Sequence, residues 1–77
     1  MAQNDGYKQA ANFLKAELAR AGVGYEELCA RLNAIGVEET YQSVAAKVNR
    51  GAFSFLFFSQ CMKVIGVKTV RLENNNE

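Results

Sequence analysis

The segment Thr40–Gly51 reads TYQSVAAKVNRG, and its pattern decides how the rest of the chain is interpreted. Apolar residues recur in it at helical spacing, with polar residues on the opposite face. The apolar stripe comprises Tyr41, Val44 (or Ala45) and Val48. Thr40 is a favourable N-cap, and Gly51 is the residue type that most readily adopts the left-handed conformation after a helix. The segment is therefore predicted to be one amphipathic helix.

Glycines divide the remaining chain into further segments with helical spacing. The glycines that follow helix-like segments are Gly22, Gly36, Gly51 and Gly66. One face of the first segment carries Leu14, Leu18 and Ala21. One face of the second carries Tyr25, Leu28, Leu32 and Ile35. This pattern predicts an all-α fold of four to five short helices.

The segment Ser54–Ile65 differs from the others because apolar residues cover nearly all of the helix that it predicts, with Ser54 as its cap. A helix that is apolar all round is buried on more than one side. The next stretch, VKTVRL over residues 67–72, alternates with period two, which predicts a short strand or an extended arm. Neither feature finds a partner within so small a chain, which favours a homodimer. The expected interface residues are Phe55, Leu56, Phe58, Met62, Val67, Val70 and Leu72. The alternative is a monomer whose first helix covers the extra rings.

The length of 77 residues predicts one domain over residues 7–72, with a disordered lead at 1–6 and a disordered tail at 73–77. A domain of this size has a thin core, which also favours self-association. The longest apolar run, at 55–58, is far shorter than the roughly 20 residues of a membrane span. No secretory signal pattern is present, so we expect a cytoplasmic protein without a membrane partner. Cys29 and Cys61 are therefore expected to be reduced and buried.

The sequence offers no catalytic constellation. Histidine is absent, and there is no phosphate-cradling glycine loop and no Ser/His/Asp set. Two cysteines without histidine fall short of the four ligands of a zinc site. We therefore expect no enzyme activity, no cofactor and no small-molecule substrate.

The net charge is only +1, but it is distributed unevenly. Residues 1–39 carry four basic and six acidic side chains, a net charge of −2. Residues 40–72 carry five basic side chains and no acidic one, and the tail adds two acids. The central segment is therefore a candidate surface for a polyanion such as double-stranded DNA. The alternative is a solvated face whose cations pair with the acidic half.

Two predicted helices joined by the short connection at 36–39 have the pattern of a helix-turn-helix unit, whose second helix enters the major groove of DNA. The residues expected to face DNA are Gln42, Ser43, Ala46, Lys47, Asn49 and Arg50. Among them, Gln42 can pair with adenine, while Lys47 and Arg50 can meet phosphate or guanine. The N-termini of the second and fourth helices can add phosphate contacts. The alternative is an ordinary hairpin of two helices with a solvated face.

The stretch QSVAAKVNRG at residues 42–51 resembles the recognition helix of the Cro/repressor-type (XRE-type) helix-turn-helix family. Residues 23–32 resemble the preceding helix of that family, and Ile65-Gly66-Val67 resembles the end of its last helix. The chain as a whole also resembles a group of short bacterial proteins of unknown function. The likeness covers residues 10–67 and implies a lambda-repressor-like fold.

This sequence departs from the repressor pattern at three points. The connection between Leu32 and Gln42 is longer, Ala45 replaces a larger apolar residue, and Glu38 and Glu39 precede the reading helix, where they would oppose DNA phosphates. The resemblance implies a small DNA-binding transcriptional regulator that acts as a dimer. The alternative is a protein–protein interaction module on the same fold without DNA binding.

Overall fold

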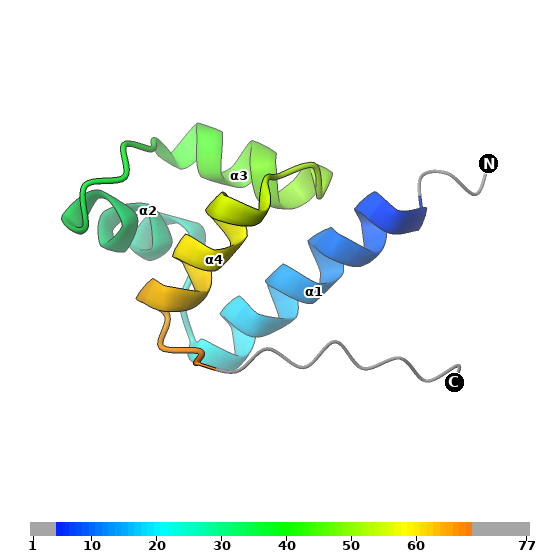
Figure 1. Cartoon of the computed structure of the whole chain (residues 1–77), viewed down its shortest axis with the longest axis horizontal. Coiled ribbons are helices and arrows are strands. Elements are labelled where there is room, and N and C mark those ends of the chain that lie inside the picture. Colours follow the sequence, from blue (N-terminus) through cyan, green and yellow to red (C-terminus); the bar gives the residue numbers. More distant parts are fainter. Residues whose placement is uncertain (1–4, 69–77) are drawn as a thin grey trace.

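The computed structural model of the chain describes residues 5–68, and in that range it contains four helices and no strand (Figure 1). The helices are α1 (Asp5–Ala21), α2 (Tyr25–Ala34), α3 (Tyr41–Arg50) and α4 (Phe55–Val64). The predicted all-α class is therefore confirmed. In the described part of the chain, no helix is both long and apolar enough to cross a membrane.

Side-chain caps start α3 and α4 at the predicted residues. The Thr40 hydroxyl accepts the Ser43 N–H at 3.0 Å, and the Ser43 hydroxyl accepts the Thr40 N–H at 2.9 Å. This reciprocal capping box satisfies two backbone donors that no turn of the helix could satisfy. Ser54 likewise accepts the Phe57 N–H at 3.0 Å. The first helix starts earlier than predicted, because α1 already includes Asp5, an acidic residue that the positive helix end favours. The predicted disordered segment at residues 1–6 therefore extends too far, because residues 5 and 6 already belong to α1.

Three of the four helices end in the same Gly-Val pair. After α1, α2 and α4, the valine N–H donates to a carbonyl five residues back, and the preceding glycine has a positive φ. The valines are Val23, Val37 and Val67. This is the Schellman arrangement, in which the residue after the glycine folds back onto the helix it ends. Each valine consequently packs against the core.

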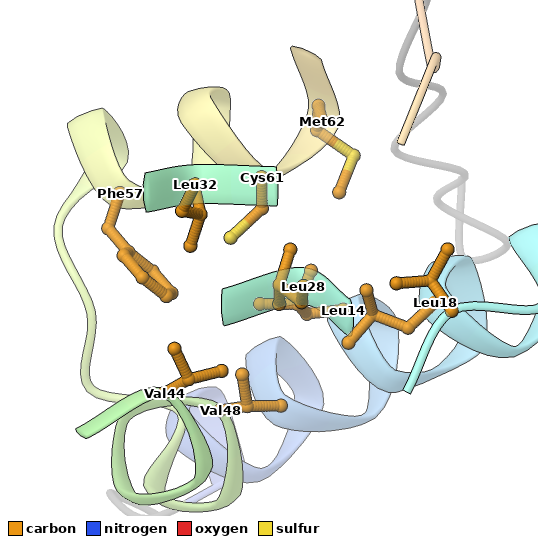
Figure 2. Close-up of a cluster of buried hydrophobic side chains, with 10 residues drawn as sticks. Leu14, Leu18, Leu28, Leu32, Val44, Val48, Phe57, Cys61 and Met62 are labelled. Carbon is orange, nitrogen blue, oxygen red and sulfur yellow. The ribbon is translucent and has the colours of Figure 1, made fainter. Parts of the chain in front are cut away.

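The core is formed by side chains from all four helices that point toward one another (Figure 2). Its fully or nearly fully buried members include Leu14 and Leu18 of α1, Leu28 and Leu32 of α2, Val44 and Val48 of α3, and Phe57, Cys61 and Met62 of α4. The helical spacing predicted most of these positions. Three predicted stripe residues are nevertheless exposed: Ala21 at the end of α1, Tyr41 in the first turn of α3, and Ile35 just after α2.

The fourth helix end, at Gly51, is different from the other three. Gly51 is buried and has a φ of 72°. The N-terminal half of α1 lies beside this end of α3 (Figure 1), so close that a Cβ on Gly51 would lie 1.8 Å from the Tyr7 carbonyl oxygen. The absence of a side chain at Gly51 therefore sets how closely α1 and α3 approach.

The structure places two residues of the predicted dimer interface against the core of their own chain. Met62 is buried among the core side chains of its own chain. Val67 packs against that core as well, because its N–H bonds the Met62 carbonyl and turns the chain back onto α4. Val67 and Lys68 do not form a strand. The rest of the predicted strand, including Val70 and Leu72, lies outside the described residues, as does the tail at 73–77.

Candidate nucleic-acid interface

Helix α3 presents four of its six predicted DNA-facing residues to solvent. Gln42, Ala46, Asn49 and Arg50 are all exposed. Val44 and Val48 occupy the opposite face and are fully buried. The amphipathic pattern of the helix therefore orients the predicted polar stripe outward, as the sequence indicates.

The other two predicted residues, Ser43 and Lys47, are half-buried and occupied by contacts within the chain. The Ser43 hydroxyl donates to Glu39 Oε1 at 2.5 Å, and Lys47 Nζ lies 2.6 Å from Glu39 Oε2. Lys47 Nζ also lies 4.8 Å from the centroid of the Phe57 ring, within cation–π distance. These contacts hold the Lys47 ammonium between Glu39 and the Phe57 ring of α4.

The Glu39 carboxylate is almost completely enclosed, with 7% of its side chain exposed, whereas 41% of the Lys47 side chain is exposed. Burial by itself acts to raise the pKa of Glu39, but the hydrogen bonds from Lys47 and Ser43, together with the Lys47 charge, hold that pKa below its ordinary value. Glu39 is therefore ionised and compensated within the domain. The expectation that Glu39 opposes DNA phosphates stays a prediction, and the structure adds that its carboxylate is directed toward Lys47. Glu38 remains exposed.

Two tyrosines connect α2 to the open face of α3. The Tyr25 hydroxyl donates to Asn49 Oδ1 at 3.3 Å, and its ring meets that of Tyr41 edge-on at 6.2 Å between centroids. Partial burial, and then the neighbouring Tyr41, raise the pKa of Tyr25, so its hydroxyl stays protonated as a donor. The start of α2 is thus fixed against the C-terminal half of α3.

The connection between α2 and α3 is ordered by polar contacts that the sequence pattern did not indicate. Asn33 Oδ1 accepts the Glu39 N–H at 3.0 Å, and the Cys29 thiol donates to the Glu39 carbonyl at 3.2 Å. Arg31 donates to the Val64 carbonyl at 3.0 Å and so links α2 to the end of α4. Both backbone groups of Glu39, its N–H and its carbonyl, are therefore bonded to side chains of α2, and this holds the loop before α3 in place.

A groove of about 630 Å³ runs between α1 and the C-terminal end of α3. Its polar lining consists of Lys8, Asn12 and Lys15 from α1 with Asn49 and Arg50 from α3. The distribution of charge along the sequence did not indicate the two lysines, because they belong to the half of the chain with a net negative charge. Their seven-residue spacing places both lysines on one side of α1, and this spacing is the sequence feature that could have indicated a shared cationic surface.

The start of α4 carries the most exposed apolar surface of the described residues. Phe55 is 80% exposed and Leu56 is 64% exposed. Phe58 is half-buried and contacts the rings of Phe13 and Phe53, at centroid distances of 5.8 and 6.2 Å. Of the predicted interface residues that the structure describes, Phe55, Leu56 and part of Phe58 are thus accessible.

Both cysteines are free thiols, and they differ in burial. Cys61 is fully enclosed, and burial raises its pKa to about 12, with the nearby Glu39 charge adding to the effect. Cys29 is only half-buried, so the prediction that both are buried is correct for Cys61 alone. No cluster of three metal-ligating side chains occurs among residues 5–68.

A protein-family model described as "Domain of unknown function (DUF6471)" matches residues 7–70. No curated protein and no solved structure matches the chain significantly.

Proposed function

The chain belongs to the DUF6471 family, whose function is unknown, and we propose that it is a small repressor-like DNA-binding protein in which α2 and α3 act as a helix-turn-helix. In this proposal α3 enters the major groove and the protein acts as a dimer in transcriptional regulation. An α-helix with its side chains is about 10–12 Å across, which matches the roughly 12 Å width of that groove.

The observation that carries the proposal is the chemistry of the open face of α3. This face offers two amides and a guanidinium, on Gln42, Asn49 and Arg50, and no carboxylate. Amide side chains pair with adenine and arginine pairs with guanine or phosphate, so the face has the groups that direct readout requires. Of the two acidic residues that precede α3, Glu39 is paired with Lys47.

Binding should be tested with fluorescently labelled duplex DNA, first as a random-sequence pool and then as the selected site. Gln42→Ala is expected to lose about 1–3 kcal/mol of discrimination at one base pair, because a bidentate amide–adenine contact is removed. Arg50→Ala is expected to weaken binding to all sequences and to lower the salt slope by roughly one if its contact is a phosphate.

Lys63→Ala provides the matched control for Arg50→Ala, because Lys63 is an exposed cation that belongs to α4 and not to α3. It should leave both affinity and salt slope nearly unchanged. If the wild-type protein shows no affinity for any duplex at about 50 mM salt, where phosphate-driven binding is strong, DNA binding is excluded.

The dimer is supported by the apolar start of α4. Residues 53–58 contain no charged side chain, so two copies of this surface can meet without repulsion. Each aromatic ring can bury about 150–250 Å², and Phe55 and Leu56 are mostly exposed in one chain. A two-fold contact between these surfaces would place two copies of α3 on paired half-sites, as repressor dimers require.

Sedimentation equilibrium at micromolar concentration is expected to give the dimer mass for the wild-type protein and the monomer mass for Phe55→Asp. The exposed ring makes few contacts within its own chain, so the variant should remain folded by circular dichroism. A wild-type monomer would refute the dimer. If that monomer also failed to bind DNA, the apolar start of α4 would favour a protein–protein interaction module instead.

A further inference from the structure

The groove between α1 and α3 concentrates positive charge from two helices. Within residues 5–68, the cationic side chains that form no ion pair are Lys8, Lys15, Arg50, Lys63 and Lys68. Three of these five line the groove, and none of the residues that line it is acidic. Such a concave cationic surface attracts anions more strongly than the same charges spread over a convex face.

The fold brings these cations together by a close backbone approach. Gly51 allows α1 to lie directly against the end of α3, and the small residues Ala11 and Ala52 are part of the groove lining. Lys8 and Lys15 stand seven residues apart on α1, which corresponds to about 10 Å along the helix axis. They can therefore contact different phosphates of one DNA strand, which follow each other at about 3.4 Å along the duplex axis.

We propose that this groove is a phosphate-binding site that holds the DNA backbone beside the base pairs contacted by α3. The inference rests on the proposed function. Its geometric basis is that the groove is continuous with the open face of α3, since Asn49 and Arg50 belong to both surfaces. Lys47, which the sequence predicted as a phosphate contact, is engaged by Glu39, and α1 supplies the cations in its place.

The first test compares the double variant Lys8→Gln/Lys15→Gln with the control Lys63→Gln/Lys68→Gln, which removes the same charge outside the groove. All four side chains are exposed, so both variants should fold. Two lost phosphate contacts should lower the salt slope for duplex DNA by about 1.8 and the affinity at 0.1 M salt by roughly 60-fold, through counterion release alone. The control should change both quantities far less.

The second test titrates the wild-type protein with inorganic tripolyphosphate and follows backbone amide shifts by NMR. Shifts should concentrate at Lys8, Asn12, Lys15 and Arg50, and they should disappear in Lys8→Gln/Lys15→Gln.

If duplex DNA binds but the groove variant behaves like the control, the inference is overturned and the proposed function stands. If no duplex binds while tripolyphosphate shifts the groove amides, the phosphate site is supported and DNA binding fails. Absence of both signals overturns both.

Discussion

Replacing Gly51 with alanine is expected to cost at least about 4 kcal/mol of stability, which is a third or more of the total expected for a domain of this size. A domain of 77 residues has a total stability of only roughly 4–12 kcal/mol. The left-handed backbone of Gly51, with a φ of 72°, by itself disfavours a side chain by about 1–2 kcal/mol.

The larger part of the cost is steric. A Cβ at this position would lie 1.8 Å from the Tyr7 carbonyl oxygen and 2.7 Å from its carbon. These are backbone atoms of a helix and cannot rotate away, so α1 would have to separate from α3. That movement would expose Leu14 and Leu18, which α1 contributes to the core. Most single substitutions cost about 0.5–3 kcal/mol of stability, so a loss of this size would be unusually large.

Gly66→Ala is the matched control, because Gly66 has a similar φ of 84° and no atom within 4 Å of an added Cβ. It should cost only about 1–2 kcal/mol, the backbone term alone. Urea unfolding followed by circular dichroism measures both. Equal losses in the two variants would show that α1 is not held against Gly51 as the structure describes.

The second large effect is expected at Glu39. Glu39→Gln should reduce stability by about 1.5–3 kcal/mol at pH 7, because hydrogen bonds to a charged group are replaced by weaker ones and Lys47 loses its partner. Partial exposure of Lys47 places the expected value toward the lower end. Glu38→Gln is the control, since Glu38 is the exposed neighbour and should change stability by less than about 0.5 kcal/mol.

The effect of Glu39→Gln should depend on pH in a defined direction. The pKa of Glu39 is lower in the folded protein than its ordinary value of 4.5, so the folded state favours the ionised form. Its contribution to stability is therefore complete above pH 4.5 and is lost as the pH falls through the lower, folded pKa. Urea unfolding between pH 7 and pH 2 should show the difference between wild type and Glu39→Gln shrinking in acid. A difference that is constant across this range would contradict the ion pair.

The sequence predicted those features of the fold that local chemistry determines. The caps at Thr40 and Ser54 and the glycine stops each depend on residues within about five positions, so they can be read from a short window. The buried positions Val44 and Val48 followed from helical spacing for the same reason. Helical spacing does not show which part of an apolar stripe another element covers, and Tyr41, which belongs to the predicted stripe, is exposed.

The candidate site was only partly predictable because its decisive contacts cross between elements. Lys47 is eight residues from Glu39 and sits over Phe57 of another helix, so neither contact follows from i,i+4 spacing. The groove joins Lys8 and Lys15 to Arg50, more than thirty positions away. A count of charges along the chain separated these residues, whereas the packing of α1 on α3 brings them together.

The contact between Gly51 and the backbone of α1 also bears on how relatives of this protein can diverge. Because main-chain atoms of Tyr7 and Ala11 form this contact with Gly51, the outward side chains of α1 take no part in it. Exchange of Lys8, Asn12 or Lys15 for other polar residues would leave this contact intact, whereas exchange of Gly51 would not. The polar chemistry of the groove and the close packing of α1 on α3 therefore depend on different residues, and one can change without the other.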